Sequence, residues 1–238
     1  MRRAVAFLTV LGGAASPGAE ALLWFPIVGA LIGLVVGGVW VGADRSWPLV
    51  AAAAIAVTVD AIVTGGLHLD GLADTGDGLL PSLPSDRRLA AMADPHVGAF
   101  GALTLLLVVL LRFAALAAGP AKVWIVAALW CGSRTAAAVV LLAGRYARPA
   151  GLASAFHATG PARLRLAAVG VTGVAVSVGL AAISRPAHGL AALAGEVVVI
   201  AGLTAFAQRR LGGYTGDVLG ADIVLGETAG LLVWAARW

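Results

Sequence analysis

Residues 22–43, LLWFPIVGALIGLVVGGVWVGA, form an apolar stretch that contains no charged side chain. About 20 consecutive apolar residues are enough to cross the hydrocarbon core of a bilayer as an α-helix. The crossing segment has to be helical, because lipid offers no hydrogen-bond partners to backbone amides and carbonyls. The stretch therefore predicts a transmembrane helix.

Apolar stretches of similar length recur along the chain. They lie at 47–66, 97–118, 122–143, 165–184, 187–207 and 218–237. Only 12% of the residues are charged and the mean hydropathy is +0.97, whereas about a quarter of a soluble domain is charged. The sequence therefore predicts an all-α fold. We expect a single integral-membrane domain over residues 1–238, built as a polytopic membrane helical bundle of about six to seven transmembrane helices.

The positions of the basic residues and of the single cysteine exclude other classes of protein. The arginines flank the apolar stretches and do not form a stripe, which favours membrane topology over nucleic-acid binding. Cys131 has no second cysteine to pair with in the chain, which excludes a disulfide framework and a multi-cysteine metal site. The first residues, Met1-Arg2-Arg3 and the apolar stretch after them, have the composition of a signal peptide. We expect instead an interfacial or re-entrant segment that the mature protein keeps.

The arginine distribution also predicts the orientation in the membrane. If the N-terminus is cytoplasmic and seven spans alternate, the inside segments hold Arg2, Arg3, Arg87, Arg88, Arg145, Arg148, Arg163, Arg165, Arg209 and Arg210. The outside segments then hold Arg45, Lys122, Arg185 and Arg237. Ten inside against four outside is the bias expected of cytoplasmic loops. The same topology places three polar segments, 67–96, 144–165 and 208–217, on the cytoplasmic face.

Segment 64–78, TGGLHLDGLADTGDG, carries the strongest chemical signal. On a helix, Asp70, Asp74 and Asp77 lie within about 60° of one another, so their carboxylates repel. A divalent cation would neutralise them, and oxygen-only ligands favour Mg²⁺ or Mn²⁺ over zinc. Small residues between the aspartates allow a backbone or ligand to approach closely. The segment predicts a magnesium site that binds a diphosphate, and a solvated helix face is the alternative.

Several other polar residues are candidates for the same site, each with a structural alternative. His68 is a candidate base or a structural histidine. Asp94 and His96 stand at a span entrance, where free amides can bind an anion, or form an ordinary helix cap. Arg134 lies inside an apolar span, so it either contacts a phosphate or pairs with a buried carboxylate.

Three further motifs complete the set of candidates. Arg145 and Arg148 follow a span, where guanidinium groups can clamp a diphosphate or anchor the helix at the interface. Thr215 is expected to cap a new helix, and the exposed backbone amides at the start of that helix can hold phosphate oxygens. Asp217 is a further metal ligand or a substrate contact.

These motifs, taken in order, resemble those of a known family. The matching pieces are TGGLHLDGLADTGDG at 64–78, Met92-x-Asp94-x-x-x-Gly98, Ser133-Arg134, Arg145-Tyr-Ala-Arg148 and Gly213-Tyr-Thr-Gly-Asp-Val-Leu-Gly-Ala221. The chain resembles the cobalamin synthase family, membrane enzymes called adenosylcobinamide-GDP ribazoletransferases. The resemblance implies transfer of α-ribazole, or its 5′-phosphate, to adenosylcobinamide-GDP, which yields adenosylcobalamin, or its 5′-phosphate, and GMP.

The resemblance and the chemistry together assign expected roles. The catalytic residues are expected to be Asp70, Asp74, Asp77, His68 and Arg134. The substrate-binding residues are expected to be Asp94, His96, Arg145, Arg148, Thr215 and Asp217. Mg²⁺ is expected on the three aspartates of segment 64–78. The expected partners are small-molecule substrates and a lipid bilayer, and no nucleic acid. We expect the protein in the bacterial plasma (inner) membrane, with its active site facing the cytoplasm. A homo-oligomer is compatible with the sequence.

Two other functions compete with this one. A CDP-alcohol phosphotransferase of lipid synthesis also uses membrane-embedded aspartates and Mg²⁺, but its first Asp-Gly is soon followed by an Ala-Arg pair, whereas Leu-Ala-Asp follows here. A divalent-cation transporter would carry acidic residues at similar depth on several spans. Most acidic residues of this chain fall instead in segments expected on the cytoplasmic side.

Overall fold

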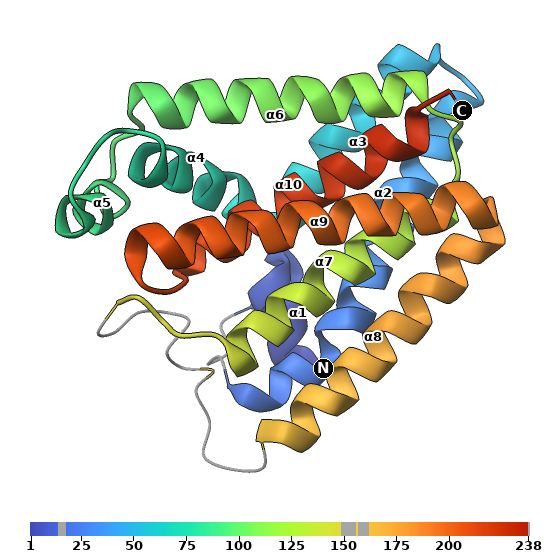
Figure 1. The fold of residues 1–238 in the computed structure, drawn as a ribbon. Coiled ribbons are helices and arrows are strands. Elements are labelled where there is room, and N and C mark those ends of the chain that lie inside the picture. Colours follow the sequence, from blue (N-terminus) through green and yellow to red (C-terminus); the bar gives the residue numbers. More distant parts are fainter. Residues whose placement is uncertain (14–17, 149–155, 157–161, 238) are drawn as a thin grey trace.

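The computed structural model describes residues 1–13, 18–148, 156 and 162–237. These residues form helices and no strand (Figure 1). In chain order the elements are α1 Arg2–Leu8, η1 Val10–Gly12, η2 Ala19–Trp24, α2 Phe25–Asp44, α3 Leu49–Thr64, α4 Leu67–Leu79, α5 Ser85–Ala91, α6 Ala99–Ala118, α7 Val123–Ala143, α8 Ala162–Ser184, α9 Pro186–Leu211 and α10 Gly216–Ala235. The predicted all-α fold is confirmed.

The helices are long and apolar enough to make this an integral membrane protein. Within the described ranges six helical segments qualify as membrane spans, and a seventh results if α3 and α4 count as one broken span. Those two helices meet at an angle of 92°. Gly65 and Gly66 form the break with φ of 62° and 70°, a left-handed conformation that glycine adopts without strain. The predicted span at 47–66 therefore ends at this break, and segment 67–79 starts a separate helix.

Helix α4 lies between α10 and α6, and its small residues permit both contacts. A Cβ atom on Gly71 would lie 2.8 Å from the carbonyl oxygen of Asp217 in α10, which is too close. On the α6 side, a Cβ atom on Gly76 would lie 2.7 Å from the hydroxyl of Thr104. The predicted close approach of a backbone to this helix is confirmed, and it brings the start of α10 against the start of α4.

The three polar segments predicted on one side of the membrane meet one another. The amide of Tyr214 donates to the carbonyl of Arg145 at 2.9 Å, and the amide of Ala147 donates to the carbonyl of Tyr214 at 2.8 Å. Arg148 also reaches the carbonyl of Met92 at 3.4 Å. Segments around residues 92, 146 and 214 therefore share one end of the bundle.

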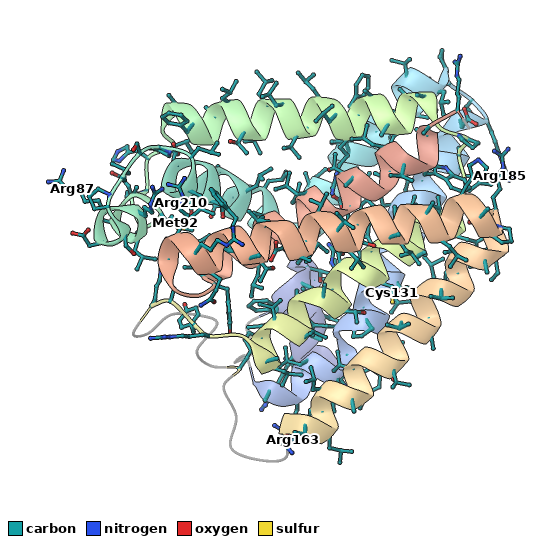
Figure 2. The ribbon with its side chains drawn as sticks, viewed as in Figure 1. Arg87, Met92, Cys131, Arg163, Arg185 and Arg210 are labelled. Atoms are coloured by element: carbon teal, nitrogen blue, oxygen red, sulfur yellow. The ribbon has the colours of Figure 1, made fainter. Side chains whose placement is uncertain are left out.

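The arginines agree with this polarity. Arg87 and Arg210 lie at the end of the bundle that holds α5 and the last turn of α9, while Arg185 lies at the opposite end (Figure 2). Cys131 lies inside α7 and is buried, in agreement with a packing role (Figure 2).

Charged residues inside the spans form a buried network. Arg112 of α6 binds Asp60 of α3 at 2.6 Å and also binds Glu227 of α10. Arg134 of α7 pairs with the same glutamate, and the indole nitrogen of Trp130 donates to Asp60 at 2.9 Å. Within this network two arginines face two carboxylates, so the four charges compensate one another, which is the condition for ionised groups to persist in a membrane interior.

Candidate active site

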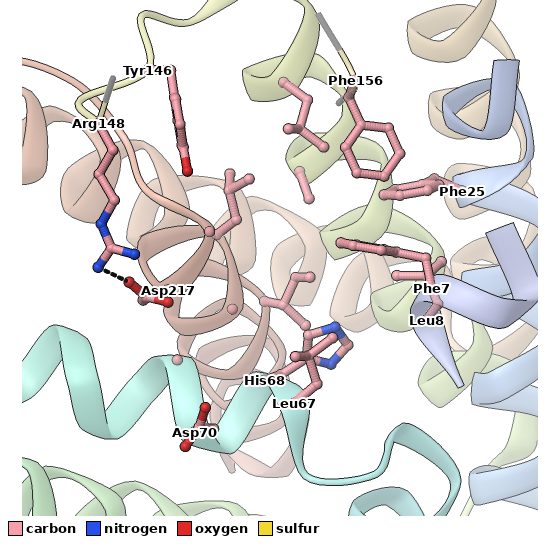
Figure 3. Close-up of a pocket in the computed structure, with 17 residues that line it drawn as sticks. Phe7, Leu8, Phe25, Leu67, His68, Asp70, Tyr146, Arg148, Phe156 and Asp217 are labelled. Atoms are coloured by element: carbon pink, nitrogen blue, oxygen red, sulfur yellow. Dashed lines mark hydrogen bonds and ion pairs between the residues drawn. The ribbon is translucent and has the colours of Figure 1, made fainter. Parts of the chain in front are cut away.

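A pocket of about 130 Å³ opens where α1, α2, α4, α7 and α10 meet (Figure 3). Its lining residues are Phe7, Leu8, Phe25, Leu67, His68, Asp70, Gly71, Ala137, Leu141, Tyr146, Arg148, Phe156, Gly216, Asp217, Leu219, Gly220 and Ile223. The charged groups stand on one side of the pocket and the phenylalanine rings on the other (Figure 3). The pocket therefore combines an acidic end with an aromatic end.

The acidic end is built by two helix starts. Asp70 stands in the first turn of α4 and Asp217 in the first turn of α10. They come together because Gly71 lets the backbone of α10 approach α4. Arg148 donates from Nη2 to Oδ2 of Asp217 at 2.8 Å. The acidic end thus holds carboxylates of two helices beside one guanidinium group.

Thr215 fixes the helix that carries Asp217. Its hydroxyl oxygen accepts a hydrogen bond from the amide of Val218 at 3.2 Å, as a helix N-cap does. The same hydroxyl lies 3.3 Å from Oδ2 of Asp217. The predicted N-cap is confirmed, and it orients the carboxylate that lines the pocket.

Asp74 and Asp77 continue the acidic face of α4 beyond the pocket lining. Asp77 accepts a hydrogen bond from the amide of Gly98 at 2.7 Å and another from the amide of Gly101 at 2.8 Å. Asp77 therefore closes the N-terminus of α6, where unpaired amides and the helix dipole favour a carboxylate. Asp74 is half-buried, and the acidic groups with the strongest electrostatic effect on it are Asp217 and Asp70.

The structure tests whether the three predicted carboxylates converge. Among the described residues, no three histidine, cysteine, aspartate or glutamate side chains stand close enough to form a ready-made metal cage. Asp77 is directed to the amides of α6, while Asp70 lines the pocket near Asp217. The sequence spacing placed the three on one helix face correctly, but their neighbours direct them to different partners.

His68 lies between the acidic and aromatic ends of the pocket (Figure 3). Its side chain is buried, and Nε2 has no hydrogen-bond partner among the described residues. A buried nitrogen without a partner is costly unless a ligand satisfies it. Of the predicted catalytic residues on α4, His68 and Asp70 line the pocket. Nε2 of His68 is a position where a ligand could bind.

Other predicted site residues stand outside the pocket lining. Asp94 and His96 are exposed, and the amide and the ring Nδ1 of His96 bind the same oxygen of Asp94 at 2.9 Å and 2.8 Å. These bonds lower the pKa of Asp94. Arg145 is exposed and uses its carbonyl to hold Tyr214. Arg134 belongs to the buried network with Glu227.

The aromatic end was not foreseen from the sequence. Phe7 of α1, Phe25 of α2 and Phe156 pack together, with ring centroids 4.9 to 5.9 Å apart. Because they come from three distant segments, no local pattern could have grouped them. The apolar character of the first residues was the only signal available.

Two further residues complete the surroundings. Arg88 is buried and donates to the carbonyls of Gly78 and Leu79, so it closes the C-terminal end of α4. Burial raises the pKa of Tyr146 above its usual value. Tyr146 lines the pocket beside Arg148 (Figure 3).

Comparisons with known proteins extend over the whole site. The family model described as Cobalamin-5-phosphate synthase matches residues 1–235. Proteins named adenosylcobinamide-GDP ribazoletransferase from Escherichia coli O17:K52:H18 (strain UMN026 / ExPEC) and Shigella boydii serotype 4 (strain Sb227) are each 37% identical to the chain over 216 residues. The alignments cover 89% of this chain and 85% of each relative. No solved structure shows significant similarity to it.

Proposed function

Since the chain belongs to the cobalamin-5-phosphate synthase family, we propose that it transfers α-ribazole, or its 5′-phosphate, to adenosylcobinamide-GDP. A ribose hydroxyl of the ribazole, one that the 5′-phosphate leaves free, attacks the phosphorus attached to cobinamide; the bond between that phosphorus and GMP breaks, and the hydroxyl proton passes to a base. The products are adenosylcobalamin, or its 5′-phosphate, and GMP. The observation that carries this proposal is a pocket with Asp70, Asp217 and Arg148 at one end and aromatic rings at the other.

Magnesium fits the donors at the acidic end. Asp70 and Asp217 line the pocket there, and Asp74 follows Asp70 on the same face of α4; their carboxylate oxygens are ligands that Mg²⁺ prefers. Mg²⁺ commonly uses one or two carboxylates together with substrate phosphates, so a cage of three protein ligands is not required. We assign Asp70 and Asp74 as the principal ligands and Asp217 as a further one. When bound, the ion would neutralise the charge of the diphosphate.

Asp77 has a different role in this proposal. Both of its oxygens already accept hydrogen bonds from the start of α6. We assign it to holding α4 and α6 together, and thereby to positioning Asp74 one turn away. This replaces the metal-ligand role expected from spacing alone.

Arg148 is assigned to the leaving group. Its hydrogen bonds to Asp217 and to the carbonyl of Met92 use Nη2, and within the described part of the chain no bond occupies the other guanidinium donors, which we assign to phosphate oxygens. A fixed positive charge there would stabilise the transferring phosphoryl group and the departing GMP. Arg134 is assigned to the buried network instead, because its partner is Glu227.

The proton of the attacking hydroxyl needs an acceptor. Asp70 and His68 both line the pocket, and His68 has a buried ring nitrogen with no partner among the described residues. These two groups are the candidates for the general base. The pocket end of the bundle is assigned to the cytoplasmic face of a bacterial inner membrane, in line with the arginine bias.

The experiment is a product assay with the purified protein in liposomes. Adenosylcobinamide-GDP, α-ribazole and Mg²⁺ are supplied, and GMP and the cobalamin product are measured together. Equal amounts of both products are expected, and omission of the ribazole should suppress GMP release. No GMP from these substrates, but CMP from a CDP-alcohol and an acceptor lipid, would assign the chain to lipid synthesis instead.

A further inference from the structure

We propose that the aromatic end of the pocket binds the base of α-ribazole, so that Phe7, Phe25 and Phe156 form the subsite of the attacking nucleoside. The proposal rests on the transferase function above and assigns each substrate to a part of the pocket. Three observations support it: the arrangement of the rings, the apolar character of their surroundings, and the position of His68.

The rings pack against one another and form an aromatic wall of the pocket, against which a flat aromatic group can lie. Phe7 and Phe156 meet edge to face at 4.9 Å, and Phe25 and Phe156 do so at 5.9 Å, while Phe7 and Phe25 stack at 5.8 Å. Aromatic groups attract one another in such geometries at centroid separations of 4.5–7 Å. Phe25 and Phe156 are each 1% exposed, so packing holds them in position.

The surroundings of the rings distinguish between the two bases in the reaction. Leu8 stands beside Phe7 and Leu67 beside His68 (Figure 3). Leu141 and Ile223 add to the apolar lining. The base of ribazole is a dimethylated benzimidazole, which is apolar apart from one imidazole nitrogen. Guanine carries several donors and acceptors on its edges, and these would lose their hydrogen bonds to water in an apolar subsite. The subsite therefore fits the benzimidazole and excludes guanine.

The order of groups along the pocket matches the order of groups along the nucleoside. The rings stand at one end, Asp70 and Arg148 stand at the other, and His68 lies between them (Figure 3). With the base against the rings, the ribose lies beside Nε2 of His68, which has no hydrogen-bond partner among the described residues. The attacking ribose hydroxyl then points toward the acidic end, where the diphosphate binds.

A pair of phenylalanine variants tests this subsite. Phe7 is only half-buried, so Phe7→Ala removes a ring at a lower cost to the fold than truncation of Phe25 or Phe156. The KM for α-ribazole should rise about tenfold, as expected when one aromatic contact is lost. The KM for adenosylcobinamide-GDP should stay within about twofold. Phe206→Ala is the matched control, because Phe206 is also half-buried but stands outside the pocket under Arg210.

A second measurement uses the unaltered protein and does not depend on a variant that folds. Free 5,6-dimethylbenzimidazole should inhibit GMP release competitively against α-ribazole and not against adenosylcobinamide-GDP, and Phe7→Ala should weaken that inhibition. Competition against adenosylcobinamide-GDP, or an unchanged KM for α-ribazole in folded Phe7→Ala protein, would overturn the subsite. Failure of the unaltered protein to release GMP would instead refute the transferase function itself.

Discussion

Arg148 and Asp217 lie 69 residues apart in the sequence, yet Nη2 of Arg148 donates to Oδ2 of Asp217 at 2.8 Å. This ion pair joins the segment after α7 to the first turn of α10 at the acidic end of the pocket. It fixes a positive charge beside carboxylates that would otherwise repel one another. The predictions below follow from this arrangement and from the contacts around it.

Replacement of Arg148 should impair the chemical step. Arg148→Ala is expected to lower kcat for GMP release about a hundredfold, because a preorganised donor to the developing charge is lost. Arg148→Lys should recover only part of the rate, since a lysine cannot reproduce the guanidinium fork. Arg87→Ala is the matched control, because Arg87 is exposed at the same end of the bundle. Equal rates for Arg148→Ala and Arg87→Ala would remove Arg148 from the mechanism.

Asp77 should behave as a helix cap. Asp77→Ala leaves the amides of Gly98 and Gly101 unpaired and is expected to cost about 1–2 kcal/mol of stability. Asp77→Asn keeps one acceptor oxygen and should lose less. Thermal unfolding in detergent measures the difference. If Asp77→Ala unfolds like the unaltered protein but needs far more Mg²⁺ for activity, Asp77 is a metal ligand and not a cap.

Glu227 should be a structural residue. It pairs with both Arg112 and Arg134, so Glu227→Gln leaves buried positive charge uncompensated, at an expected cost of about 3–5 kcal/mol. The folded yield and unfolding temperature should fall, while the KM values of the remaining folded protein stay unchanged. Glu20→Gln, at an exposed position, is the control. If Glu227→Gln has normal stability but a much lower kcat, the network of Glu227 with Arg112 and Arg134 takes part in catalysis.

The pocket end should face the cytoplasm. The natural Cys131 is buried, so a cysteine introduced at an exposed position can be labelled selectively. Ala93→Cys lies at the pocket end and Ser46→Cys beyond the far end of α2. A membrane-impermeant maleimide should label only Ser46→Cys in intact cells, and both variants after lysis. Labelling of Ala93→Cys in intact cells would invert the topology.

Much of the fold could be predicted from the sequence because apolar length alone defines membrane helices. The spans at 22–43 and 97–118 agree closely with α2 and α6. The break at Gly65 and Gly66 was harder to predict, because apolar residues continue across it and only the backbone conformation of two glycines separates α3 from α4.

The site could be predicted only where its residues are close together in the sequence. The spacing of Asp70, Asp74 and Asp77 revealed an acidic helix face, but not that Asp77 caps α6 through amides that lie 21 and 24 positions further along the chain. Arg134 was expected either to contact a phosphate or to pair with a buried carboxylate, because it lies inside a span. The structure pairs it with Glu227, which lies on a different helix far along the chain. Such pairings are decided by helix packing, which short motifs do not encode.

The most direct test of the central claim is a magnesium titration of GMP release by Asp74→Asn in liposomes. The substitution removes the negative charge but keeps the size of the side chain, so the protein should insert and unfold like the unaltered one. Asp86→Asn, at an exposed site on α5, is the control. Asp74→Asn should release no GMP at any Mg²⁺ concentration, whereas the control should keep its activity. Full activity of folded Asp74→Asn would contradict a metal-dependent transfer at this acidic site.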